Sequence, residues 1–79
     1  MMVKLILLGT SGCHLCEEAE LIMASCNNVE IELIDIAEQE QWQEKYAIRI
    51  PVLYHAETES ELGWPFTQEQ AQDFIDALV

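Results

Sequence analysis

The chain has very few basic residues. Its 79 residues include only Lys4, Lys45 and Arg49 as lysine or arginine, against 15 aspartates and glutamates, for a formal net charge of -12. Nucleic acids and anionic membrane surfaces carry the same sign of charge, so neither is expected as a partner. We interpret most of the acidic residues as a solubilising surface, with a basic patch on a client protein as the alternative target.

Long hydrophobic runs are also absent. The longest apolar run, Leu5 to Leu8, is far shorter than the roughly 20 residues that span a bilayer. Together with Lys4 and the following "TSGC", it loosely resembles a bacterial lipoprotein signal ending at Cys13, but such signals have an apolar region of roughly seven to fifteen residues. We therefore expect a soluble, cytoplasmic protein.

Internal repeats, low-complexity tracts and Gly/Ser linkers are missing from the sequence, which has 3 glycines and 2 prolines. A chain of this length holds one domain at most, so residues 1–79 are predicted to form a single domain with a small core. We expect this domain to be monomeric.

The first half of the chain alternates between two periodicities. Residues 3–8 are almost continuously apolar, which predicts a strand covered on both faces. From Cys13 the apolar residues fall at helical spacing, in the stripe Leu15, Ala19, Ile22 and Cys26. Residues 29–33 alternate between apolar and acidic and predict a second strand, after which Asp35 is expected to cap a short helix running through Trp42 to about Lys45.

The second half predicts a hairpin and a last helix. Residues 52–55 and 60–63 flank the turn-like "AETE" and predict two antiparallel strands. Thr67 and Gln70 form a capping box, with Phe66 placed to pack against Ala71, and the apolar face of the last helix comprises Ala71, Phe74, Ile75 and Leu78.

The resulting order, β-α-β-α-β-β-α, predicts an α/β fold. A strand, a helix and a second strand imply a parallel pair, and the following hairpin adds antiparallel strands to the same sheet. We expect a four-stranded mixed sheet flanked by helices.

Two of the 3 cysteines stand three residues apart where the first strand gives way to the first helix. Cysteines at i and i+3 share a helix face, so Cys13 and Cys16 can reach disulfide geometry. Free N–H groups and the helix dipole stabilise a thiolate at the helix start, and the thiolate is the attacking species in disulfide exchange. Cys13 is therefore predicted as the nucleophile and Cys16 as the resolving cysteine.

Neighbouring residues modify this prediction. Glu17 and Glu18 oppose a thiolate, so we expect the pKa of Cys13 to lie only modestly below that of a free thiol. His14 is interpreted as solvated, with a supporting cationic role near neutral pH as the alternative. Cys26 lies roughly 15 Å beyond Cys16 along the helix, out of disulfide reach, and is interpreted as a core residue.

A C-x-x-C pair also suits other functions. Small metal carriers hold soft metals such as copper with two thiolates after a first strand. In those carriers "MTC" precedes the second cysteine, whereas Ser11-Gly12 replaces that threonine here. The predicted helix around Trp42, where the carriers have a strand, also separates the two folds. A further alternative is a non-catalytic adaptor whose cysteines are regulatory or vestigial.

The motifs "GCHLCEEA", "YAIRIPVL" and "WPFTQEQ" together resemble the thioredoxin superfamily, and within it a family of small glutaredoxin-like proteins. The resemblance covers nearly the whole chain. It implies a thioredoxin-like, glutaredoxin-type fold, with a cis peptide bond before Pro51 and a loop that faces the cysteine pair. It also implies that Ile50 and Pro51 bind the substrate, Ile50 through its backbone. Arg49 would contribute to substrate binding as the fixed positive charge nearest to Cys13, with a solvated arginine as the alternative.

The resemblance implies a thiol–disulfide oxidoreductase that acts on a disulfide-containing protein or a small thiol, with a reductase that the sequence does not name. The chain departs from typical glutaredoxins at His14-Leu15, at Arg49-Ile50-Pro51 and at Gly63-Trp64-Pro65. These departures argue against glutathione binding, and glutathione stays open only as the reductant. We predict no bound cofactor and no metal site.

Overall fold

The structure, a computed structural model, describes residues 2–46 and 49–78. Its elements are, in order, β1 (Val3–Gly9), α1 (His14–Ala24), β2 (Val29–Asp35), a 3-10 turn η1 (Ile36–Glu38), α2 (Glu40–Tyr46), β3 (Val52–His55), β4 (Ser60–Gly63) and α3 (Gln68–Leu78). The predicted order of strands and α-helices is confirmed, and η1 is an addition that the sequence did not predict. The prediction of a single domain also covers residues 1, 47, 48 and 79, which lie outside the described residues.

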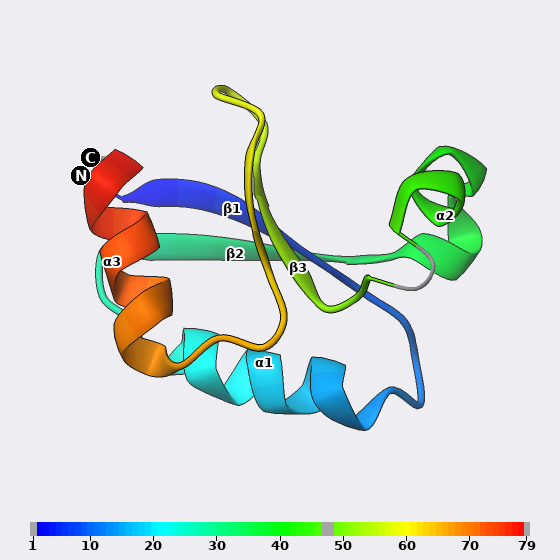
Figure 1. Cartoon of the computed structure of the whole chain (residues 1–79), viewed down its shortest axis with the longest axis horizontal. Coiled ribbons are helices and arrows are strands. Elements are labelled where there is room, and N and C mark those ends of the chain that lie inside the picture. The colour runs from blue at the N-terminus through cyan, green and yellow to red at the C-terminus, as the bar shows by residue number, and fades with distance from the viewer. Residues whose placement is uncertain (1, 47–48, 79) are drawn as a thin grey trace.

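The strands form one four-stranded sheet in the order β2-β1-β3-β4 (Figure 1). β1 pairs in parallel with β2, and α1 makes the connection between them. On its other side β1 pairs antiparallel with β3, which continues into the β3-β4 hairpin. The sheet is therefore mixed, as predicted.

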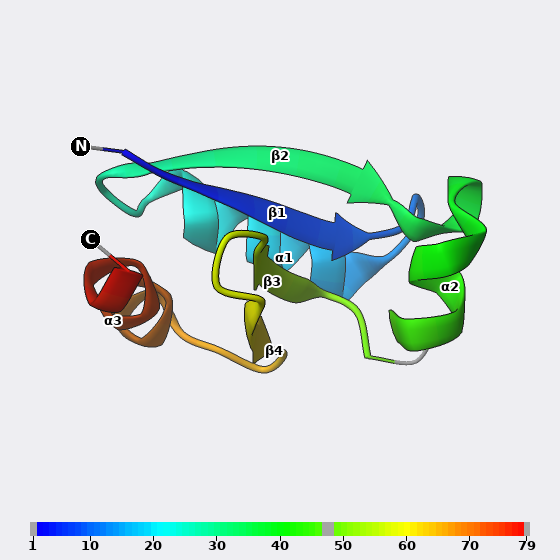
Figure 2. The same ribbon diagram turned by 90° about the horizontal axis from the view of Figure 1, so that it is seen from above.

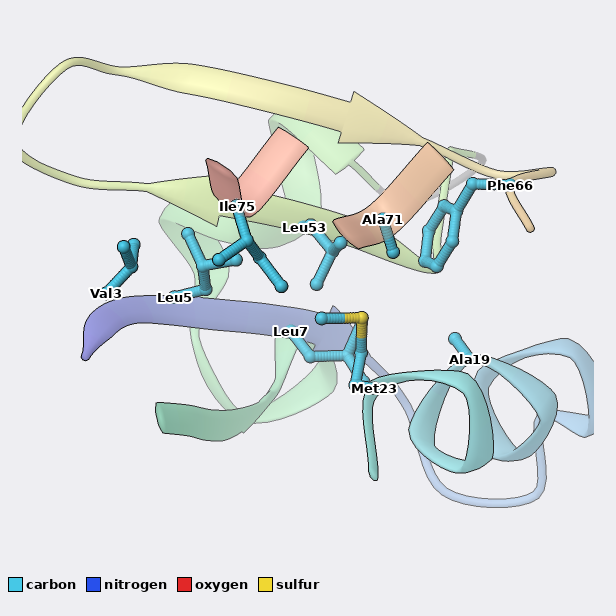
Figure 3. Packing of buried hydrophobic residues seen from close by; sticks show 9 residues of the cluster. All are labelled: Val3, Leu5, Leu7, Ala19, Met23, Leu53, Phe66, Ala71 and Ile75. Carbon is cyan, nitrogen blue, oxygen red and sulfur yellow. The ribbon is translucent and has the colours of Figure 1, made fainter. Parts of the chain in front are cut away.

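The main core lies where α1 and α3 pack on the sheet, as the close view shows (Figure 3). Its buried members are Val3, Leu5, Leu7, Ala19, Met23, Leu53, Phe66, Ala71 and Ile75. Full burial of a valine, leucine, isoleucine, methionine or phenylalanine side chain contributes about 1.5–3 kcal/mol to the free energy of unfolding. These contacts therefore fix α1, whose first residues carry the cysteine pair, against the sheet.

A second, smaller cluster lies on the other face of the sheet. Side chains alternate between the two faces of a strand, so Leu8 and Val52 point away from the main core and pack with Ile36 and Tyr46. α2 lies beyond the end of β2 (Figures 1 and 2). This helix covers the second face only near that end.

The prediction that both faces of β1 are covered is therefore wrong for most of the strand. Lys4 is exposed and Ile6 is only half-buried, while Leu8 is completely buried. The physical reason is the shortness of α2, which spans 7 residues and cannot extend along the whole strand.

The predicted stripe of α1 is also partly wrong. The buried side chains are Cys16, Ala19 and Met23, whereas Leu15 remains 45% exposed and Cys26 only packs against the edge of the core. Both sets repeat at helical spacing. The helix packs through the set that contains Cys16, which turns this cysteine inward.

The start of α3 matches its prediction. The Gln70 N–H donates to Thr67 Oγ1 at 3.1 Å, and the Thr67 N–H donates to Gln70 Oε1 at 2.9 Å. This reciprocal capping box satisfies two backbone donors at the helix start. Phe66 and Ala71 are buried in the same core, and Trp64 packs edge-on against Phe66 with 5.0 Å between ring centroids.

None of the helices within residues 2–46 and 49–78 has the length and apolar character needed to cross a membrane.

Candidate functional site

Cys13 is the N-cap residue of α1. Its backbone is extended, with φ -95° and ψ 111°, and its Sγ accepts a hydrogen bond from the Cys16 N–H at 3.2 Å. Gly12 immediately before it has φ 76°, a left-handed conformation that glycine adopts without steric cost and that turns the chain into the helix. A backbone donor thus points at the Cys13 sulfur, at the positive end of the helix dipole.

The sulfurs of Cys13 and Cys16 are bonded to each other as a disulfide, with 5.2 Å between the two Cα atoms. This confirms the prediction that the pair can form a disulfide. The two cysteines differ in access, because Cys13 is partly exposed whereas Cys16 is only 6% exposed. Cys13 is therefore the more accessible of the two sulfurs.

Gly9, at the end of β1, lies directly against Cys16. A Cβ atom on Gly9 would lie 3.0 Å from Cys16 Sγ and 3.2 Å from Cys16 Cβ. Nonbonded carbon and sulfur atoms do not approach this closely without displacement. Glycine at this position therefore lets the inward-facing sulfur pack against the strand, a requirement that the sequence analysis missed.

A small cavity of about 150 Å³ lies beside Cys16, lined by residues of β1, β2 and α1. Glu20 and Asp35 are among its lining residues, most of which are apolar. The volume is sufficient for a few water molecules. Cys16 thus lies beside this cavity although only 6% of its surface is exposed.

The charged residues around Cys13 are solvated. His14 Nδ1 lies 3.7 Å from Glu17 Oε2, and the two side chains are 97% and 67% exposed. An exposed pair of this kind contributes little energy. This agrees with the interpretation of His14 as a solvated residue.

The loop before β3 ends at the same edge of the sheet as the cysteine pair. Val52 lies opposite Leu8, one residue before the end of β1, so Pro51 lies beside the edge from which the chain passes to Cys13. The Ile50–Pro51 peptide bond is cis, as the family resemblance implied. The Trp64–Pro65 bond is also cis, which the sequence analysis did not predict.

Both ends of this loop are held by the rest of the protein. The Pro51 carbonyl accepts from the Trp64 N–H at 3.2 Å, and the Arg49 N–H donates to the Tyr46 carbonyl at 2.8 Å. Within the described residues, the backbone of Ile50 between them has no hydrogen-bond partner. Ile50 therefore presents an N–H and a carbonyl that can pair with an extended peptide.

Arg49 is engaged by a neighbour that the sequence analysis missed. Its Nη2 donates to Glu61 Oε1 at 2.6 Å, and its guanidinium lies 5.4 Å from the ring centroid of Tyr46. The Tyr46 hydroxyl donates to the other carboxylate oxygen, Glu61 Oε2, at 2.6 Å. One carboxylate from β4 thus holds a residue of α2 and a residue of the proline loop together.

The position of Glu61 follows from the hairpin. Glu61 lies opposite Tyr54, so it lies on the face of the sheet that carries the second cluster rather than on the face that packs against α1. The alternation of residues in the hairpin was a usable signal for this face. Its contact with Tyr46 depends on where α2 lies, which the sequence pattern does not specify.

A sequence model of one protein family, described as "Glutaredoxin-like domain (DUF836)", matches residues 4–76. The match contains the cysteine pair, the proline loop and the start of the last helix. The chain belongs to the glutaredoxin-like family.

Solved structures agree with this assignment. The crystal structure of protein XcR50 from X. campestris, a structural-genomics target, is 29% identical, with a TM-score of 0.84 over 92% of this chain and 96% of that one. The solution structure of protein Ne2328 from Nitrosomonas europaea is 28% identical, with a TM-score of 0.71 over 95% of this chain and 93% of that one. Among curated proteins, none matches the chain.

The contact between Gly9 and Cys16 predicts the behaviour of two glycine variants of this glutaredoxin-like protein. We expect Gly9→Ala to lower the free energy of unfolding by about 1–3 kcal/mol, because the added methyl overpacks the site. Gly63→Ala is the matched control, since a Cβ there meets no atom within 4 Å. Urea unfolding of both variants measures the difference, and equal stabilities would contradict the close packing.

The Tyr46–Glu61 hydrogen bond predicts a pH dependence. Burial, reinforced by the hydrogen bond and negative charge of Glu61, raises the pKa of Tyr46 from 10.0 to about 12. A pKa raised by folding means that the protonated phenol stabilises the fold fully below pH 10 and that this contribution is lost as the pH rises towards about 12.

Ultraviolet absorption of tyrosinate measures this titration, with Tyr46→Phe as the control that removes it. We expect the wild-type free energy of unfolding to fall more steeply above pH 10 than that of Tyr46→Phe, because only the wild type loses the contribution of this phenol. Ionisation of Tyr46 at its ordinary value of 10.0 would contradict the hydrogen bond to Glu61.

Proposed function

We propose that this glutaredoxin-like protein is a thiol–disulfide oxidoreductase. In the reduced protein, the Cys13 thiolate attacks one sulfur of a substrate disulfide and forms a mixed disulfide, and the second substrate sulfur leaves as a thiolate that takes up a proton. Cys16 then loses its proton and attacks the Cys13 sulfur, which releases the first substrate sulfur as a thiol. Two electrons pass from the protein dithiol to the substrate, and the Cys13–Cys16 bond closes.

The observation that carries this proposal is the different placement of the two sulfurs. Cys13 is accessible at the helix start and accepts the Cys16 N–H, whereas Cys16 is buried behind it. The first position suits a nucleophile with a stabilised thiolate, and the second suits a sulfur that reacts only with its neighbour.

The proline loop supports a peptide-like substrate. Within residues 2–46 and 49–78 the backbone of Ile50 has no hydrogen-bond partner, and it precedes β3 at the end of the sheet where β1 leads to Cys13. An extended segment of a substrate can add main-chain hydrogen bonds there. We therefore assign Ile50 and Pro51 to substrate binding. Arg49 is assigned to the same loop, although its guanidinium is directed to Glu61.

The metal-carrier alternative has less support. Within residues 2–46 and 49–78, no group of three or more histidine, cysteine, aspartate or glutamate side chains is arranged to hold a metal ion. A carrier would have to rely on the two thiolates alone, whereas both the burial of Cys16 and the neighbouring proline loop suit disulfide exchange.

A reduced resting dithiol also suits the cytoplasm, which we propose as the location.

Substrate trapping tests the proposal. Cys16→Ser removes the resolving thiol, so mixed disulfides on Cys13 should accumulate when the reduced variant is mixed with a cell lysate and then alkylated. Non-reducing gels and mass spectrometry measure the adducts, and the double variant Cys13→Ser/Cys16→Ser should lose them. Adducts that persist in this double variant would place the reactive thiol at Cys26, and an absence of adducts from both would contradict the exchange mechanism.

A further inference from the structure

The predicted substrate loop carries a cation that the protein neutralises itself. Glu61 binds the Arg49 guanidinium at 2.6 Å, and the Tyr46 hydroxyl fixes the other oxygen of the same carboxylate. Tyr46 is completely buried, so one end of this arrangement is anchored in the second cluster. The Arg49 and Glu61 side chains are 49% and 28% exposed, so the ion pair lies at the surface where a substrate could compete for it.

Lys4 and His14 do not replace the Arg49 cation. Lys4 lies near the start of β1, in register with Glu30 and at the opposite end of the strand from Gly9. His14 is accompanied by Glu17 at 3.7 Å. Among the described side chains, Arg49 is therefore the permanent cation of the proline loop, and the negative charge of Glu61 neutralises it.

We propose that Glu61 is a specificity-determining residue that disfavours anionic disulfides, such as oxidised glutathione, relative to neutral or cationic ones. This inference rests on the proposed function, because it concerns the disulfide that Cys13 attacks. By holding Arg49, Glu61 keeps the guanidinium on the face of the sheet that carries the second cluster. The carboxylates of an approaching anion then meet a protein of net charge -12, and the Arg49 cation of the proline loop is already engaged by Glu61.

Removal of Glu61 should convert the loop into an anion-binding one. In Glu61→Gln the amide oxygen can still accept from Tyr46, which preserves the loop, but the charge that holds Arg49 is gone. A released guanidinium about 10 Å from an anionic substrate should accelerate its reaction by about two- to fourfold at low salt, an effect that should shrink as salt screens the charge.

The experiment uses three disulfides that differ in charge: oxidised glutathione, an anion; bis(2-hydroxyethyl) disulfide, which is neutral; and cystamine, a cation. The second-order rate constant of each with the reduced protein is measured by rapid acid quench, alkylation and mass spectrometry, at low and at high salt. Rates are compared as variant over wild type, so that intrinsic differences between the reagents cancel.

Two variants serve as controls. Glu57→Gln removes the same charge from an exposed position in the turn between β3 and β4, away from the Arg49 ion pair. The double variant Glu61→Gln/Arg49→Gln removes the cation that the inference says is released. We expect Glu61→Gln alone to raise the rate constant for oxidised glutathione selectively. In the double variant this rate constant should return to the wild-type value.

The outcomes separate the inference from the function. If Glu61→Gln changes all three rates by one factor, or Glu57→Gln gives the same gain, or the gain persists in the double variant, Glu61 does not act through Arg49 and the inference is wrong. If the wild type exchanges with none of the three disulfides, the proposed function fails and the inference fails with it.

Discussion

At the end of β1, Leu8 lies between Ile34 of β2 and Val52 of β3. This register brings together two segments that are far apart in the sequence. The chain leaves β1 at Gly9 and reaches Cys13, the N-cap of α1, four residues later. Pro51, the last residue of the proline loop, immediately precedes Val52. Backbone pairing in the middle of the sheet therefore positions Cys13 and the proline loop at one end of the sheet, and the buried side chains on both faces stabilise that pairing.

The two faces of the sheet then have different roles. The face that packs against α1 and α3 holds the inward sulfur of Cys16, with Gly9 making the room that this sulfur needs. The opposite face, at the end covered by α2, holds Tyr46 and the Arg49–Glu61 ion pair. The packing of the cysteine pair and the charge of the proline loop thus depend on separate sets of contacts.

Periodicity and turn residues were sufficient to predict the strands and the α-helices but not η1, and the strands 52–55 and 60–63 have the predicted bounds. Periodicity could not choose between the stripes of Leu15 and of Cys16, because both repeat at helical spacing. The cis bond before Pro51 came from the family resemblance and not from the residues. The contacts of Glu61 and Gly9 depend on how whole elements pack, so no local pattern could have predicted them.

The central claim is that Cys13 and Cys16 form a working redox pair. A titration of the metal-free protein in dithiothreitol buffers, with free thiols counted by alkylation and mass spectrometry, tests it most directly. The account predicts a reversible two-electron transition at these two cysteines, at roughly -180 to -270 mV, while Cys26 remains a free thiol. Cys13 and Cys16 remaining reduced throughout the titration would contradict it.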